Sequence, residues 1–269
     1  MDKKRCIAVA GLIGMEVWVC AGAVAQKVPT LGKILERLQE NLNQYDSSVP
    51  SFFCDERVLS FAQRGPGPVN TMIGTVTDST FLLKRIPRPD DQVILRESRE
   101  VKKVNGKPVT GDSIGGGMLF VGAFSNGLAL VSLSQQACMD YTLEPSDPGQ
   151  PKAPVLVEFA SVAAGKRPAD CRMQEDVSGR AVIDPETMQV KRMQFHAPHH
   201  MIGTRMGWWD VTVEYAPVEL DGKIFWLPKK ISESMSDRAT SWSYGASYRN
   251  YHKMEATSRI LSSDETPAP

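Results

Sequence analysis

Apolar residues recur at helical spacing between residues 30 and 45 of the chain. Residues three and four apart lie on the same face of an α-helix, so this spacing predicts an amphipathic helix over 30–45. Thr30 can cap the first turn, and Pro50 lies beyond the end, since proline disfavours helical backbone in the residue before it. The apolar face of this helix consists of Leu31, Ile34, Leu35, Leu38 and Leu42.

Most of the remaining chain alternates between apolar and polar residues, as antiparallel strands with one face in water do. Asn105-Gly106 and Asp221-Gly222 are strong hairpin signals, because both turn residues adopt positive φ. Asp184-Pro185 suits a β-turn between two further strands. Strands are expected over residues 52–61, 71–86, 93–104, 141–143, 155–162, 177–184, 188–195, 208–218, 223–227, 229–235, 241–251 and 253–260.

One expected strand, residues 93–104, alternates with charge, which is typical of a strand with one wet face. The charged residues of this strand include Arg96, Glu97, Arg99 and Glu100.

Residues 113–135 break the alternation. Gly115-Gly116-Gly117 is followed by an apolar, small-residue run from Met118 to Leu133. We interpret this run as a buried middle helix, interrupted at Gly127. A pair of core strands is the alternative, and the length of the run favours the helix.

The first 25 residues have the form of a secretory signal peptide. Lys3-Lys4-Arg5 is a basic start, an apolar run follows, and Ala23-Val24-Ala25 has the small-x-small form that signal peptidase cleaves. We therefore expect cleavage near Ala25 and a periplasmic or secreted protein. Glu16 disfavours the alternative of an uncleaved anchor, since a charge in a membrane-spanning helix costs roughly 2.5–3.5 kcal/mol. Lipid attachment at Cys20 is another alternative, disfavoured by Val19 where Gly or Ala is usual.

The length, 269 residues, allows a single β-rich domain, expected over residues 26–261, followed by a polar, disordered tail over 262–269. Lys and Arg number 31 and Asp and Glu also 31. This balance excludes the basic footprint of a nucleic-acid partner. After the signal no apolar run reaches about 18 residues, so we expect no transmembrane span in the mature chain.

Three cysteines remain once the signal is removed: Cys54, Cys138 and Cys171. An oxidising compartment permits a disulfide, and an odd number leaves one thiol over. We favour Cys138–Cys171, because both lie in one β-rich stretch beside short turns. Cys54 follows Phe52-Phe53 and suits a buried small side chain.

Catalytic motifs are absent from the sequence, which contains no G-x-S-x-G nucleophile elbow and no phosphate-binding loop. His196, His199 and His200 are weak candidates for a zinc or copper site. An exposed polar loop is the favoured interpretation of that segment. We therefore expect no cofactor and no enzyme activity, with a metal-dependent enzyme as the less favoured alternative.

Four segments of the C-terminal half carry a family resemblance: Ser178 to Arg192, Val213 to Val218, Phe225 to Pro228 and Tyr248 to Tyr251. They resemble the outer-membrane lipoprotein-sorting-protein group, which includes the periplasmic lipoprotein carrier and its receptor. The resemblance covers roughly residues 30–260 in topology and 178–251 in motif. It implies an α+β, mostly antiparallel fold: an incomplete, half-open β-barrel with an N-terminal helix and a buried middle helix against an apolar cavity.

Two functions remain open beside the enzyme. The resemblance implies an exported binding protein that carries a lipid or a lipoprotein acyl chain in its cavity. The alternative is a non-catalytic envelope module whose core is filled by its own side chains, since aromatic residues also simply pack sheet cores. For the first, the expected cavity lining is Phe120, Phe124, Leu128, Leu130, Trp208 and Trp226.

Overall fold

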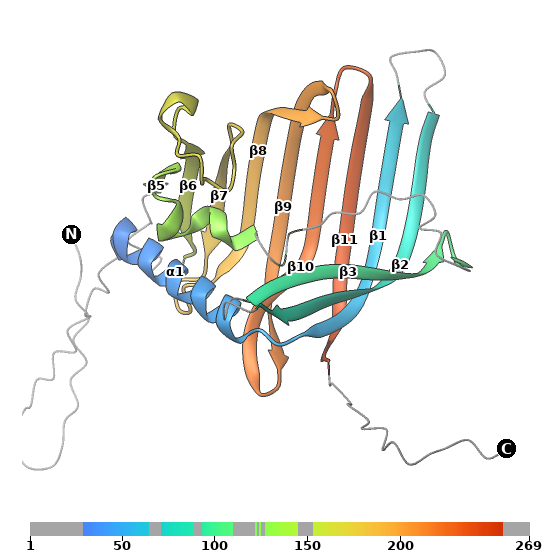
Figure 1. Cartoon of the computed structure of the whole chain (residues 1–269), viewed down its shortest axis with the longest axis horizontal. Coiled ribbons are helices and arrows are strands. Elements are labelled where there is room, and N and C mark those ends of the chain that lie inside the picture. The colour runs from blue at the N-terminus through green and yellow to red at the C-terminus, as the bar shows by residue number, and fades with distance from the viewer. Residues whose placement is uncertain are drawn as a thin grey trace, which may run out of the picture.

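The computed structural model describes residues 29–64, 71–88, 93–109, 122, 124, 127–144 and 153–254. Within these ranges one curved sheet carries a helix and short 3-10 turns on one face (Figure 1). The helical elements are α1 (Leu31–Ser48), η1 (Gly127–Val131), η2 (Leu133–Gln135) and η3 (Ala164–Lys166). The strands are β1 (Phe52–Arg64), β2 (Thr71–Pro87), β3 (Val93–Val104), β4 (Lys107–Pro108), β5 (Met139–Leu143), β6 (Val155–Ser161), β7 (Ser178–Ile183), β8 (Val190–Ile202), β9 (Arg205–Leu220), β10 (Lys223–Ser236) and β11 (Thr240–Lys253).

The strand order is β4-β3-β2-β1-β11-β10-β9-β8-β7-β6-β5, and each neighbouring pair is antiparallel. The first long strand lies beside the last one, and Phe52 is in register with Lys253. β4 and β5 stand at the two ends of the order, so the sheet does not close. The expectation of a mostly antiparallel, open sheet with an N-terminal helix is confirmed.

α1 begins and ends close to its predicted limits and buries its apolar face, including Ile34, Leu35, Leu38 and Leu42. Tyr45 extends that face by one turn. The helix lies on one face of the sheet, called here the covered face (Figure 1). Alternate residues of β1, among them Phe52, Cys54 and Val58, point to this face and are buried, because side chains alternate between the two faces of a strand.

The turns expected from sequence are present. Asn105 and Gly106 both have positive φ, as do Asp221 and Gly222. In the turn after β7, the Asp184 carboxylate accepts hydrogen bonds from the backbone N–H groups of Glu186 and Thr187, both 3.0 Å long. Hydrogen bonds from that turn hold the pKa of Asp184 below its ordinary value.

The expected disulfide is confirmed. Cys138 and Cys171 are joined, which links the start of β5 to the segment before β7. Cys54 is free and buried, and burial raises the pKa of its thiol far above the ordinary value. In the described part of the chain, no helix is both long and apolar enough to cross a membrane.

Three expectations differ from the structure. The middle helix over 113–135 is not seen: residues 127–131 form η1, residues 133–135 form η2, and residues 110–121 lie outside the described ranges. The segment around His196 is not a loop but the second half of β8. The two strands expected on either side of Pro228 are one strand, β10, because a bulge between Pro228 and Lys230 absorbs the irregularity.

The signal peptide over 1–25, the tail over 262–269 and most of the strand expected over 253–260 also lie outside the described residues.

Candidate functional site

The centre of the covered face holds an aromatic cluster around Phe124. This side chain is 3% exposed. Its ring centroid lies 4.4 Å from that of Phe81 on β2, 5.0 Å from Tyr248 on β11 and 5.9 Å from Phe52 on β1. Phe124 therefore sits on β2, β1 and β11 as an apolar side chain that belongs to none of these strands.

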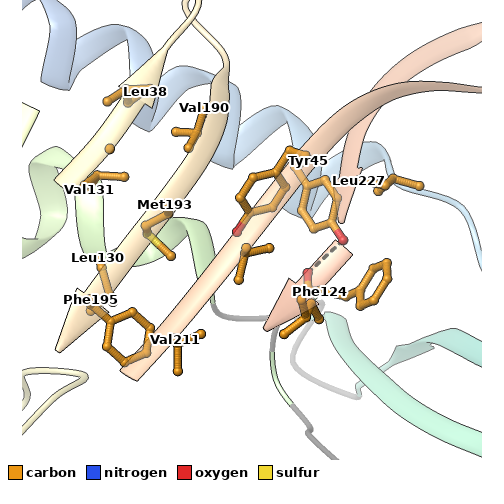
Figure 2. Close-up of a cluster of buried hydrophobic side chains, with 14 of the residues drawn as sticks. Leu38, Tyr45, Phe124, Leu130, Val131, Val190, Met193, Phe195, Val211 and Leu227 are labelled. Atoms are coloured by element: carbon orange, nitrogen blue, oxygen red, sulfur yellow. Dashed lines mark hydrogen bonds between the residues drawn. The ribbon is translucent and has the colours of Figure 1, made fainter. Parts of the chain in front are cut away.

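The backbone around Phe124 forms hydrogen bonds with side chains of α1 and β3. The Glu97 carboxylate on β3 accepts hydrogen bonds from the N–H of Gly122 at 2.8 Å and the N–H of Phe124 at 3.1 Å. The Tyr45 hydroxyl on α1 donates to the Phe124 carbonyl at 2.7 Å (Figure 2). Burial, followed by the charge of Glu97, raises the pKa of Tyr45, so this hydroxyl stays protonated and remains a donor.

η1 continues the packing beside Phe124. Leu130 and Val131 are buried, and Figure 2 shows them on the side of Met193, Phe195 and Val211 from β8 and β9. The Tyr141 hydroxyl on β5 donates to the carbonyl of Leu130 at 2.8 Å. Phe124 and η1 are thus each bound to the covered face by apolar contact and by a tyrosine hydroxyl.

A buried ion pair lies beside the aromatic cluster. Arg99 on β3 donates from Nε to both carboxylate oxygens of Glu56 on β1, at 2.9 and 2.8 Å. Its guanidinium lies 5.1 Å from the centroid of the Phe81 ring. Burial raises the pKa of Glu56, and the charge of Arg99 opposes that shift.

Two charged residues of β3 do not lie on its wet face. Glu97 and Arg99 turn to the covered face, where each has a specific partner. The sequence contained one signal for this: the two residues are two positions apart and therefore share a face of the strand. Their partners, at residues 56, 122 and 124, are too far along the chain for that spacing to identify.

A second buried acid lies further along the covered face. Glu233 on β10 accepts a hydrogen bond from Nε1 of Trp209 on β9 at 2.5 Å. The Trp209 ring also contacts His200, with centroids 4.8 Å apart, and His200 Nδ1 lies 2.7 Å from a carboxylate oxygen of Glu175. Burial raises the pKa of Glu233 to about 7, against the lowering effects of Trp209 and His200.

The predicted lining residues do not form one group. Phe124 and Leu130 belong to the buried core, and Leu128 and Trp226 pack against it. Trp208 is exposed; it precedes Trp209 on β9, so it points to the opposite face of the sheet. Phe120 lies outside the described residues.

The three histidines do not converge. His196 Nδ1 lies 2.7 Å from Asp210, His200 is paired with Glu175, and His199 is exposed. Across the described residues, no group of three or more His, Cys, Asp or Glu side chains is arranged to hold a metal ion.

Comparison with known proteins gives fold neighbours only. No protein-family model and no curated protein matches the chain. Among solved structures, the neighbours include a LolA superfamily protein from Nitrosomonas europaea, with 12% identity, a TM-score of 0.32, and coverage of 85% of this chain and 96% of that one. A putative outer membrane lipoprotein-sorting protein domain from Vibrio parahaemolyticus has 11% identity, a TM-score of 0.35, and coverage of 82% and 92%.

A DUF1329 family protein from Desulfovibrio piger is a third neighbour, with 10% identity, a TM-score of 0.34, and coverage of 84% of this chain and 94% of that one. Identities and scores this low transfer no residue role and no ligand to this chain.

Proposed function

We propose that this chain is an exported, non-catalytic binding protein that takes an acyl chain of a lipid or lipoprotein on its covered face. The ligand would lie where Phe124 now lies, on the apolar surface formed by Phe52, Phe81 and Tyr248. The observation that carries the proposal is the way Phe124 is held. Its ring fills an apolar site on the sheet, but among the described residues its backbone is bound by the side chains of Glu97 and Tyr45.

The chemistry of the site agrees with an acyl ligand. An acyl chain needs contiguous apolar surface and no polar partner, and the three rings around Phe124 offer that surface. The position of Phe124 can be vacated without breaking a β-ladder, because its backbone N–H and carbonyl bind the side chains of Glu97 and Tyr45. The Cys138–Cys171 disulfide supports the exported location, since disulfides persist in oxidising compartments.

The competing proposal is an envelope module with a filled core. The same burial of Phe124 and Leu130 favours it, because both behave as core residues. Binding distinguishes the two proposals. A carrier binds a fluorescent fatty acid, whereas a filled module binds none.

The test compares two truncations of buried phenylalanines. Phe124→Ala removes the ring from the proposed site, and Phe159→Ala removes an equally buried ring on β6. Each should lower the free energy of unfolding by about 3–5 kcal/mol. We expect Phe124→Ala to bind the fluorescent fatty acid more tightly than the parent chain, and Phe159→Ala not to. The carrier proposal would be rejected if none of the three proteins binds the fluorescent fatty acid.

Export is tested separately. N-terminal sequencing of the tagged chain recovered from the periplasm should begin at Gln26. Recovery of an intact Met1 from cytoplasmic protein would reject the exported location and leave the binding experiment unaffected.

A further inference from the structure

One end of the sheet carries large apolar side chains in contact with water. The hairpin between β8 and β9 places Met201 opposite Met206 in register, and Trp208 follows on the same strand as Met206. Met201 is 49% exposed, Met206 59% and Trp208 38%. Exposed apolar side chains that gather in one place mark an interaction surface more often than those scattered singly.

Two of these side chains, Met206 and Trp208, border a surface hollow of about 780 Å³. Met206 and Trp208 line one side of it, and Arg238 and Ala239, from the turn between β10 and β11, line another. Gly207 permits this arrangement: a Cβ there would lie 2.1 Å from the carbonyl oxygen of Ser236 on the neighbouring strand. The glycine therefore brings the two hairpins together at this end of the sheet.

The charge at the hollow is positive. Arg205 and Arg238 are both exposed. Among the residues that line the hollow the acid is Asp237, and its carboxylate already accepts hydrogen bonds from the N–H groups of Ala239 and Thr240, both 2.7 Å long. The other carboxylate oxygen of Asp237 lies 3.6 Å from Nη1 of Arg205. Because this ion pair is long and the arginine is exposed, it contributes little to stability. Arg238 forms no ion pair with any described residue, so its charge is available to a ligand.

We propose that this end of the sheet docks on a membrane surface that contains anionic phospholipids. The tip surface is defined as Met201, Arg205, Met206, Trp208 and Arg238. Exposed Trp and other apolar side chains partition into the boundary between headgroups and acyl chains, and arginine pairs with phosphate. A protein partner could meet the same apolar groups. The two exposed arginines beside an internally satisfied carboxylate favour an anionic bilayer instead.

This inference goes beyond the proposed function, because it concerns where the protein meets a membrane rather than what lies on its covered face. It stands whether or not Phe124 marks an acyl site. A chain that fails to bind a fatty acid can still bind vesicles, and the two experiments fail independently.

The test is co-sedimentation of the folded protein with vesicles of phosphatidylcholine, with and without phosphatidylglycerol. We expect binding to the anionic vesicles and a marked loss of binding at high salt. The double variant Arg205→Ser/Arg238→Ser should bind them more than tenfold more weakly, since each arginine near an anionic surface contributes about fivefold. Met206→Ser/Trp208→Ser should lose binding as well and keep its thermal unfolding temperature, because both residues are exposed.

A matched control lies at the other end of β9. The hairpin between β9 and β10 also carries an exposed basic residue, Lys223, beside an exposed apolar one, Ile224, which is 67% exposed (Figure 1). Lys223→Ser/Ile224→Ser should bind anionic vesicles like the parent chain. The proposal is overturned if the parent chain does not sediment with anionic vesicles, or if the control variant loses as much binding as the tip variants.

Discussion

Arg99 on β3 reaches across β2 to Glu56 on β1, and passes over the ring of Phe81 on the way. Both charged side chains are almost fully buried. Replacement of Arg99 by Met would leave a buried carboxyl group without its partner. We expect Arg99→Met to lower the free energy of unfolding by about 3–5 kcal/mol, measured by chemical denaturation at neutral pH.

The double variant Arg99→Met/Glu56→Met is the control for that prediction. It removes both charges, so no uncompensated group stays in the core, and it should be more stable than Arg99→Met alone. A double variant as unstable as the single one would mean that Arg99 acts through its packing on Phe81 and not through its charge.

Glu233→Gln should change the pH dependence of stability. The folded-state pKa of Glu233 is about 7, above the ordinary value of 4.5. Between these values the folded protein keeps a proton that the unfolded chain loses, so the stability of the parent chain falls as the pH rises through this range. The amide cannot ionise but can still accept the hydrogen bond from Trp209.

The variant and the parent should therefore have similar stability near pH 4.5, and by pH 8 the variant should be more stable by up to about 3 kcal/mol. Denaturation curves at both pH values measure the difference. A stability difference that does not change with pH would contradict the raised pKa.

Loss of the disulfide should be costly, because Cys138 and Cys171 are 33 residues apart in the sequence. Closing a loop of this length stabilises the folded state by about 3–4 kcal/mol through the unfolded chain. We expect Cys138→Ser/Cys171→Ser to lose that amount in urea denaturation. A reductant should destabilise the parent chain and leave the double variant unchanged, since Cys54 has no disulfide.

Gly179 on β7 allows its strand to approach β8 closely. A Cβ at this position would lie 2.2 Å from the carbonyl oxygen of Gln194 and 2.6 Å from the ring of Phe159. Since a backbone atom cannot turn aside, Gly179→Ala should lower the free energy of unfolding by about 1–3 kcal/mol. Gly165→Ala is the matched control, because nothing lies within 4 Å of its added methyl group, and thermal unfolding should show little change.

The secondary structure could be predicted largely from local pattern. α1 and β3 have strong periodicity and clear end signals, and their limits match the structure closely. The segment over 113–135 could not be assigned in this way, because its apolar and small residues show no clear period that separates helix from strand. Its described part forms short 3-10 turns that tertiary packing determines.

The site could be predicted only in part. Phe124 and Leu130, predicted as apolar side chains that face the sheet, lie in the buried core, and their role in a ligand cavity stays a prediction. Glu97, Arg99 and Glu233 were missed, because an acid or base is normally exposed unless a distant residue pairs with it. Nothing in the local sequence links residue 97 to residue 124, or residue 233 to residue 209.

The pairing of β1 with β11 has a consequence for how the chain folds. Register partners such as Phe52 and Lys253 lie about 200 residues apart, and contacts of such separation form slowly. During synthesis β2 can pair with one edge of β1 early, whereas the other edge stays open until the last strand emerges. The covered face cannot be completed before then, so a nascent chain presents the half-built apolar surface and an unpaired strand edge to chaperones for most of its synthesis.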